Sequence, residues 1–207
     1  MASVGGHGLA LDVTDEAAGA ALDRAIAAKG PLRGLVNCAG IGGASRIVGR
    51  EGPMPLANFA RTIQVNLIGT FNMMRLAVAR MQTNAPDADG ARGAIVNTAS
   101  VAAFDGQIGQ AAYAASKGGI VSLALPAARE LARFGIRVNA VAPGVIGKPD
   151  KLKTTPAHQL EASIRLTPMR RIGTVDECVG AFLFLASTDM AGFITGQVVE
   201  VNGGLQM

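Results

Sequence analysis

Short apolar runs alternate along the chain with longer segments in which apolar residues recur at helical spacing. Most of the runs are apolar at consecutive positions, which is typical of strands buried on both faces of a parallel sheet. This alternation predicts βαβ units with right-handed crossovers. The predicted strands are residues 8–13, 34–39, 94–99, 136–141 and 197–201.

Helices are predicted from the apolar spacing between these runs. Thr14 is a candidate N-cap of a first helix, and the Lys29-Gly30-Pro31 sequence ends that helix. Further helices are expected at about 56–81, 111–134 and 175–186. Residues 42–55, 83–92 and 144–156 are predicted loops, of which the last follows a strand and is a plausible lid. No repeat or linker divides the sequence, which predicts one domain over 1–207.

Composition narrows the class of protein. The 207 residues are 49% hydrophobic and 16% charged, with a net charge of +4, and no basic stripe interleaved with aromatics suggests nucleic-acid binding. Cys38 and Cys178 lie beside neither His nor another Cys, so we interpret both as small buried hydrophobes rather than as metal ligands. No apolar run reaches the roughly 18 residues that span a bilayer, and no signal-peptide pattern opens the chain. We therefore expect a cytoplasmic protein without nucleic-acid or membrane partners.

The candidate chemistry lies around the only tyrosine. Tyr113 and Lys117 are four positions apart on a predicted helix, so they share a face, and Ser100 follows a strand thirteen positions before Tyr113. A free phenol titrates too high for acid–base work at neutral pH, and an adjacent ammonium favours the phenolate. Ser100 could hydrogen-bond a carbonyl oxygen as charge develops on it. A lone Tyr-x-x-x-Lys pair would more often be an ordinary pair on a helix surface.

Three predicted strands end alike, with a Val-Asn pair followed by small residues. The three asparagines are Asn37, Asn97 and Asn139. In open α/β sheets ligands bind outside the carboxyl ends of the strands, where small residues allow close approach and Asn side chains can hold the loops. Simple termination of the strands is the alternative for any one of them.

The motifs taken in order resemble those of the short-chain dehydrogenases/reductases. The active-site signature of that family is similar to Asn97-Thr98-Ala99-Ser100 followed by Tyr113-Ala114-Ala115-Ser116-Lys117. The resemblance implies that Tyr113 is the acid/base and that Ser100 binds the substrate oxygen. Lys117 would favour the phenolate and hold the nicotinamide ribose. Asn66, in Val65-Asn66-Leu67, would join Ser100, Tyr113 and Lys117 as the fourth member of the family's catalytic tetrad. It would fix a water in the proton relay.

The same resemblance implies a nicotinamide cofactor and a secondary alcohol or ketone as a small-molecule substrate. The middle of the chain resembles short-chain 3-hydroxyacyl-CoA and hydroxysteroid dehydrogenases, which favours NAD over NADP and gives Gln107 a place facing the substrate. The family also implies a homo-oligomer, a tetramer or dimer, formed through the helices that begin near Leu56 and Ala111. The residues implied to bind the cofactor, besides Lys117, are Asp12, Val13, Asn37, Ala39, Gly40, Pro143, Gly144 and Ile146.

The fold implied is a Rossmann-like, doubly wound parallel α/β sheet, truncated at the N-terminus. The recognisable pattern begins at Asp12, so we expect the first two strands and the glycine-rich turn that holds the pyrophosphate to be absent. Gly5-Gly6-His7-Gly8 precedes a predicted strand, whereas the phosphate-binding turn follows one. A Thr that the family carries after its Pro-Gly pair is replaced by Lys148.

Three explanations of this pattern stay open. The chain is a fragment or mis-started version of an enzyme, a natural short relative with weak cofactor affinity, or a non-catalytic partner subunit. We also expect the strand at 8–13 to pair directly with that at 34–39, because an uncovered strand edge invites aggregation. The alternative is that the first thirty residues are poorly anchored.

Overall fold

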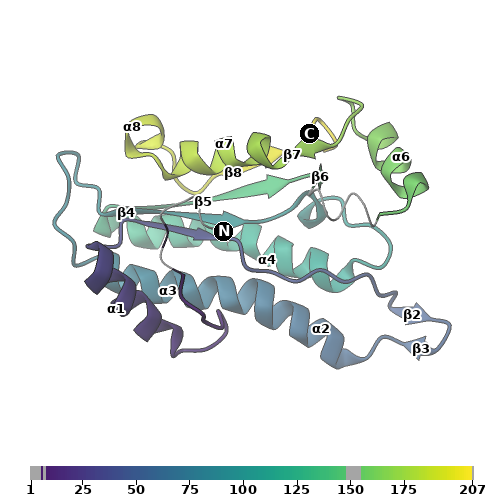
Figure 1. The fold of residues 1–207 in the computed structure, drawn as a ribbon, viewed down its shortest axis with the longest axis horizontal. Helices are drawn as coiled ribbons and strands as arrows, with labels where there is room; N and C mark the ends of the chain where they lie inside the picture. The colour runs from purple at the N-terminus through teal and green to yellow at the C-terminus, as the bar shows by residue number, and fades with distance from the viewer. Residues whose placement is uncertain (1–5, 7, 148–154, 207) are drawn as a thin grey trace.

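The computed structural model describes residues 6, 8–147 and 155–206. Its centre is a four-stranded, all-parallel sheet in the order β1-β4-β5-β8, with helices on both faces (Figure 1). The predicted doubly wound α/β fold is therefore confirmed. Because the strands are parallel, their carboxyl ends lie along one edge of the sheet, where Asn37 is in register with Asn97 and Thr98 with Val141.

The elements follow the predicted alternation. The sheet strands are β1 (Gly34–Asn37), β4 (Gly93–Thr98), β5 (Ile136–Pro143) and β8 (Val198–Val201). The helices are α1 (Ala18–Lys29), α2 (Leu56–Ile63), the π-helix η1 (Gln64–Ile68), α3 (Gly69–Met81), η2 (Val101–Ala103), α4 (Ala111–Leu131), η3 (Ala132–Phe134), α6 (Ala157–Leu166), α7 (Val175–Ala186) and α8 (Thr188–Ala191). Two-residue strands form the pairs β2 (Val48–Gly49) with β3 (Gly52–Pro53), and β6 (Ile146–Gly147) with β7 (Gly173–Thr174).

The core is built by the alternation of side chains along the central strands. Ile95, Ile136 and Val138 pack against apolar residues of α3 and α4 on one face. Val96 and Val141 pack on the other face against Cys178 and Leu185 of α7. Both faces of β4 and β5 are buried, which explains why these strands are apolar at nearly every position.

The predicted strand at residues 8–13 is wrong. These residues form no strand, and within the described chain β1 pairs with β4 alone, so that Val36 is 46% exposed. The local reason is a turn in which Asp12 Oδ1 accepts hydrogen bonds from Thr14 N and Thr14 Oγ1, both at 2.8 Å. Thr14 is thereby engaged and does not cap the helix. Helix α1 begins at Ala18 behind Ala17, which has no side-chain cap.

The first helix is nevertheless held firmly, by α3 rather than by the sheet. Asn72 Nδ2 donates to Val13 O at 2.8 Å and to Asp15 O at 2.9 Å. Arg80 pairs with Asp23 at 2.7 Å and donates to Gly19 O at 2.9 Å. The expected re-pairing is therefore wrong, and the alternative of poor anchoring does not describe residues 13–29.

The bounds of the remaining predicted helices and loops can be compared with those in the structure. The helix expected at 56–81 is a continuous helical run in which η1 separates α2 from α3, and the helix at 175–186 is α7 with the same bounds. The predicted loop 42–55 contains the β2–β3 hairpin, and α6 was not predicted. The loop predicted at 144–156 as a plausible lid contains β6. Its residues 148–154, including Lys148, lie outside the described residues. Over the part of the chain described, none of the helices is long and apolar enough to cross a bilayer.

The anchoring of α1 generates a testable expectation. Asn72→Ala removes two hydrogen bonds to buried or half-buried backbone and should lower the free energy of unfolding by about 1–3 kcal/mol. Hydrogen exchange should accelerate selectively over residues 8–29, because the contacts of the sheet are untouched. Asn58→Ala, at an exposed position of α2, is the matched control. Uniform acceleration over the whole chain would contradict a local anchor.

Candidate active site

The carboxyl ends of β1 and β4 are joined by side chains. Asn37 Nδ2 donates to Asn97 Oδ1 at 2.9 Å, and Thr98 Oγ1 donates to Asn37 O at 2.6 Å. At β5, Asn139 Nδ2 donates to Ile194 O at 2.9 Å, and its Oδ1 accepts from Gln197 N at 3.0 Å. The prediction that these asparagines hold the loops at the carboxyl edge is not borne out, because Asn37 and Asn97 join two strands and Asn139, inside β5, holds the segment that leads into β8.

Asn66 lies in the π-helical turn η1, inside the long α2–α3 run, and its side chain is fully buried. Its Oδ1 accepts from Ile41 N at 2.8 Å, and its Nδ2 donates to Ile41 O at 2.9 Å and to Ser116 Oγ at 3.0 Å. Single π turns inside α-helices are frequently found at functional sites. Asn66 thus ties the loop after β1 to helix α4.

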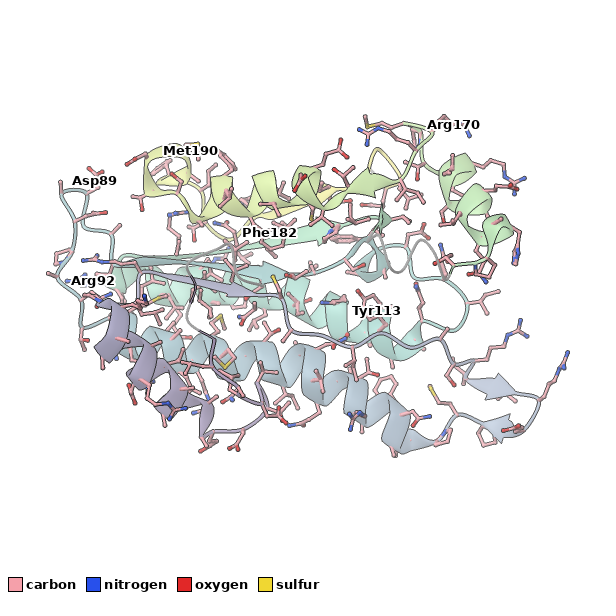
Figure 2. The ribbon with its side chains drawn as sticks, in the orientation of Figure 1. Asp89, Arg92, Tyr113, Arg170, Phe182 and Met190 are labelled. Carbon is pink, nitrogen blue, oxygen red and sulfur yellow. The ribbon has the colours of Figure 1, made fainter. Side chains whose placement is uncertain are left out.

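Lys117 is the buried cation of the site. Its side chain is 4% exposed, its Nζ donates to Thr98 O at 2.6 Å, and Nζ lies 5.7 Å from the centre of the Tyr113 ring. Tyr113 is half-buried near the start of α4 (Figure 2). Ser116 Oγ donates to Tyr113 O at 2.7 Å. The predicted pairing of Tyr113 with Lys117 on one face of a helix is therefore present.

Burial lowers the pKa of Lys117 from 10.5 to about 8, and nearby Cys38 acts in the opposite direction. The cause is desolvation, because a buried ammonium loses hydration that one backbone carbonyl only partly replaces. Lys117 remains mostly protonated at neutral pH. Because Lys117 is buried, its charge acts on the nearby Tyr113 ring in surroundings where electrostatic interactions are stronger than in water.

Ser100 is placed by the end of β4. It is the N-cap of η2, its Oγ accepts from Ala102 N at 3.2 Å, and it is 9% exposed. The hydroxyl hydrogen stays available for another acceptor, since this bond uses only an oxygen lone pair. Because η2 packs against α4, Ser100 and Tyr113 belong to neighbouring segments at the carboxyl edge of the sheet.

Two glycines allow the backbone to approach closely at this edge. A Cβ at Gly40 would lie 3.3 Å from Asn66 Oδ1 and 3.8 Å from Lys117 Nζ, so a side chain there would crowd both. A Cβ at Gly144 would lie 2.8 Å from Asn202. Gly144 follows Pro143, the last residue of β5, so both positions border the carboxyl edge.

The other predicted cofactor residues fall in different environments. Ala39 is exposed beside Gly40, and Ile146 packs on the apolar cluster under α7. Asp12 is exposed, and the hydrogen bonds from the backbone and hydroxyl of Thr14 lower its pKa. Val13 packs beside Gly69, where a Cβ would lie 2.7 Å from Val13 Cγ2. Asp12 and Val13 thus lie beside the start of α3, and α3 begins three residues after Asn66.

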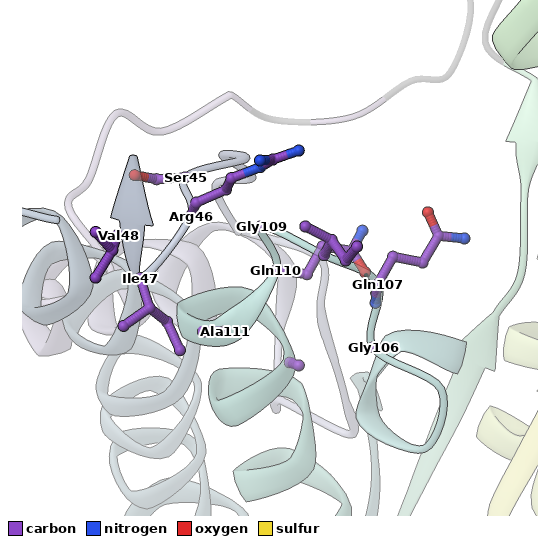
Figure 3. Close-up of a pocket in the computed structure, with 11 residues that line it drawn as sticks. Ser45, Arg46, Ile47, Val48, Gly106, Gln107, Gly109, Gln110 and Ala111 are labelled. Carbon is purple, nitrogen blue, oxygen red and sulfur yellow. Dashed lines mark hydrogen bonds between the residues drawn. The ribbon is translucent and has the colours of Figure 1, made fainter. Parts of the chain in front are cut away.

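Gln107 lines a cavity of about 570 Å³ between the loop before α4 and the segment that leads into β2 (Figure 3). Gln107 is exposed, and its backbone N–H donates to Gln110 Oε1 at 3.0 Å. Because this bond does not use the side-chain amide of Gln107, that amide can face a ligand. Ala114, the neighbour of Tyr113 on α4, lines the same cavity. The predicted role of Gln107 in substrate binding remains a prediction that this placement permits.

Three further residues matter that the sequence reasoning did not assign. Ser116 connects Asn66 to Tyr113, and Thr98 accepts the hydrogen bond of Lys117. The sequence could have pointed to both residues, because each lies next to a residue of the active-site motif. Cys38 is exposed at the site, so its interpretation as a buried hydrophobe is wrong, whereas that of Cys178 is confirmed. Within the described ranges no three His, Cys, Asp or Glu side chains are grouped to hold a metal ion.

Comparisons with known proteins agree on the family. The family model for enoyl-(acyl carrier protein) reductases, within the short-chain dehydrogenases/reductases, matches residues 1–206. The 3-hydroxyacyl-CoA dehydrogenase type-2 of Bos taurus is 44% identical over 205 residues, covering 95% of this chain and 75% of the relative. The human protein of the same name is 46% identical over 175 residues, covering 83% of this chain and 66% of the relative.

The chain is also similar to a solved structure and to a relative with a different name. The crystal structure of 3-hydroxyacyl-CoA dehydrogenase type-2 from Mycobacterium avium superposes with a TM-score of 0.88 at 39% identity, covering 96% of this chain and 76% of that one. A Xanthobacter autotrophicus protein named inactive 2-(S)-hydroxypropyl-CoM dehydrogenase 2 is 41% identical over 204 residues, covering 96% of this chain and 84% of the relative. The chain therefore belongs to the short-chain dehydrogenase/reductase family of oxidoreductases.

Proposed function

We propose that the chain is an NAD-dependent oxidoreductase that interconverts a secondary alcohol and a ketone, with a 3-hydroxyacyl-CoA or hydroxysteroid-like substrate, in the cytoplasm. The observation that carries the proposal is the buried ammonium of Lys117 beside the ring of Tyr113. The names of the relatives support hydroxyacyl chemistry. NAD is preferred to NADP only from the resemblance to those dehydrogenases.

The residues at the sheet edge fit one half of a nicotinamide dinucleotide. In the described chain Lys117 Nζ uses one of its three donors, on Thr98 O, and the remaining two suit the hydroxyls of a ribose. Gly40 leaves room that a side chain would fill beside the same Nζ. The pyrophosphate half has no matching element in the described residues, where α1 is preceded by the Asp12 turn rather than by a strand and a glycine-rich turn.

When bound, the nicotinamide supplies or accepts the hydride. The Tyr113 hydroxyl donates a proton to the ketone oxygen during reduction and its phenolate accepts that proton during oxidation. The Lys117 ammonium stabilises the phenolate. The Ser100 hydroxyl donates a hydrogen bond to the same substrate oxygen, where negative charge accumulates as the hydride arrives.

Asn66 is a positioning residue in this scheme. Its side chain is occupied by Ile41 and Ser116, and its backbone oxygen accepts from Thr70 Oγ1 at 2.7 Å. The relay water that the family resemblance implies would bind beside these groups. The hydrogen bonds of Asn66 place the loop that contains Ile41. Through Ser116 they also place the first turn of α4.

A non-catalytic partner subunit is the second candidate. One observation favours it: a relative at 41% identity carries the word inactive in its name. Such a subunit would keep the fold and the assembly surfaces and would not bind dinucleotide.

Either function is compatible with a homo-oligomer, which we propose to be a tetramer. One set of exposed apolar side chains lies on α2, η1, α3 and α4, namely Leu56, Ile68, Phe71 and Leu125. A second set lies on or next to α7 and α8, namely Val179, Leu183, Met190 and Phe193. A tetramer with crossing two-fold axes needs two different self-complementary interfaces, whereas a dimer needs one.

The deciding experiment is a titration of NADH and NADPH into the purified chain by calorimetry. We expect saturable binding, tighter for NADH, that weakens about tenfold or more in Lys117→Ala because a buried charged donor is lost. Lys29→Ala, on the exposed end of α1, should bind as the wild type does. Absence of binding at millimolar cofactor in a folded chain would contradict the enzyme and leave the partner subunit.

The pKa of Lys117 predicts a pH-dependent stability. The folded-state pKa of about 8 lies below the ordinary lysine value of 10.5. The unfolded chain therefore binds more protons between these values, and stability rises with pH across that window. Below pH 8 the buried charge destabilises the fold by about 3 kcal/mol. Lys117→Met removes this penalty and also the hydrogen bond from the charged Nζ to Thr98 O, which contributes about 1.5–3 kcal/mol. The pH dependence of the stability difference, and not its size at one pH, therefore reports the desolvation.

Urea denaturation should therefore find the free energy of unfolding of Lys117→Met falling by about 3 kcal/mol relative to that of the wild type as the pH rises from 8 to 10.5. The comparison of the two chains cancels titration elsewhere. Lys29→Met serves as the control, and its difference from wild type should stay flat over this window. A difference between Lys117→Met and wild type that stays flat over this window would contradict the desolvation account.

The assembly can be tested at α7. Leu183→Arg places a charge in the second apolar set, where Leu183 is 63% exposed, and sedimentation should show a tetramer converted to a smaller species with unchanged secondary structure. The same substitution at Ala28, an exposed position of α1 outside both apolar sets, provides the control. An unchanged mass for Leu183→Arg would exclude this surface from the assembly.

A further inference from the structure

The backbone oxygen of Thr98 lies where the ladder between β1 and β4 stops. Ala94 N donates to Arg33 O at 3.0 Å, and in a parallel ladder such bonds recur at every second residue of each strand. Thr98, four residues after Ala94 on β4, therefore turns its backbone oxygen toward β1 as well. Because β1 ends at Asn37, the backbone N–H that would continue the ladder lies beyond the strand. Lys117 Nζ donates to this oxygen at 2.6 Å instead.

The side chain of the same threonine holds the end of β1. Thr98 Oγ1 donates to Asn37 O at 2.6 Å, and Cys38 Sγ lies 3.6 Å from the same hydroxyl oxygen. The side chain of Asn37 is fixed in turn, because its Nδ2 donates to Asn97 Oδ1 at 2.9 Å and to Thr70 O at 3.4 Å. Thr98 thus contacts the last residue of β1 through its hydroxyl and the buried cation of the site through its carbonyl.

The surroundings of the Lys117 ammonium make it sensitive to the position of the chain after β1. Its side chain is 4% exposed, so water cannot readily replace a lost acceptor, and burial already lowers its pKa to about 8. A Cβ at Gly40, three residues after the end of β1, would lie 3.8 Å from Nζ. The titratable groups near Nζ are Cys38, which raises this pKa, and Tyr113, whose ring centre is 5.7 Å away.

We propose that Thr98 is a positioning residue of the site. Its hydroxyl holds the end of β1, so that its own carbonyl receives the Lys117 ammonium at a fixed place beside Tyr113. This inference rests on the proposed function, in which that ammonium stabilises the phenolate and binds the ribose. Thr98 acts through Lys117 and not by contact with the reacting atoms. Small displacements of a catalytic group lower the rate steeply, which is why one hydroxyl at this place affects the chemistry.

The first measurement follows Lys117 directly and needs neither cofactor nor turnover. The chain is labelled with carbon-13 at the lysine ε-carbons and titrated by NMR, and the Lys117 signal is identified by its absence from Lys117→Met. Thr98→Val keeps the shape of the side chain and removes the hydroxyl, and Thr98→Ala removes it too. The ammonium then loses its fixed acceptor in a site that stays buried, so the midpoint of the Lys117 titration should fall by about half a pH unit or more.

Two further variants separate positioning from a general loss of stability. Thr98→Ser keeps the hydroxyl and should titrate as the wild type does. Thr62→Val on α2 is the matched control, because Thr62 is buried and its Oγ1 donates to Asn58 O at 3.1 Å. It loses the same kind of hydrogen bond away from the site, and its Lys117 titration should equal that of the wild type.

The second measurement is the reduction of acetoacetyl-CoA by NADH. Thr98→Val should lower kcat by about threefold to tenfold, the effect of one neutral hydrogen bond, and leave KM for the thioester within about twofold. Thr98→Ser should restore kcat. In an active enzyme, an unchanged kcat in Thr98→Val or a loss that Thr98→Ser does not restore would overturn the inference.

The outcomes of the two measurements distinguish this inference from the proposed function. A Lys117 titration that is unchanged or raised in Thr98→Val, or lowered equally in Thr62→Val, would overturn the inference even if the wild type reduces the thioester. A lowered midpoint in Thr98→Val that Thr98→Ser restores, in a chain that binds no dinucleotide, would sustain the positioning of Lys117 while the proposed function fails.

Discussion

The site depends on the amide of Asn66. This one buried side chain satisfies both the N–H and the C=O of Ile41 and also donates to Ser116 Oγ. Ser116 in turn donates to the backbone oxygen of Tyr113. A buried polar network is stable only when its members are paired, so replacement of this amide would leave several groups unsatisfied at once. The loop after β1 and the first turn of α4 therefore hold their positions together.

The π turn explains how Asn66 can do this. It inserts an extra residue into the helical run from α2 to α3, which changes the direction of the side chains that follow relative to those that precede it. Helix α2 and the turn pack against α4, while α3 packs against the sheet strands β1 and β4. A regular helix would not serve both neighbours with the same residues. The irregular turn thus supports the site, in agreement with where such turns occur.

Sequence reasoning predicted the parts that repeat a simple period and those carried by ordered motifs. The four sheet strands, α4 and α7 followed from apolar spacing, and Asn66, Ser100, Tyr113 and Lys117 followed from the family motifs. The strand at 8–13 failed because a local turn at Asp12 outweighs an apolar pattern of six residues. The hairpin was missed because two-residue strands have no period to detect. The fixing of α1 depends on Asn72, 57 positions from Asp15, which local patterns cannot reveal.

The chemical and the binding halves of the site are built from different parts of the chain. The proton transfer that we propose would use Tyr113, Lys117 and Ser100, positioned by the Asn66 network, and all of these groups rest on the sheet edge and on α4. Pyrophosphate binding in this fold class relies on backbone N–H groups at the start of a helix that follows a strand. Nothing in the geometry of Tyr113 depends on such a helix. The arrangement of Asn66, Ser100, Tyr113 and Lys117 therefore bears on the proposed chemical step alone and carries no information on the affinity for a dinucleotide, which must be measured separately.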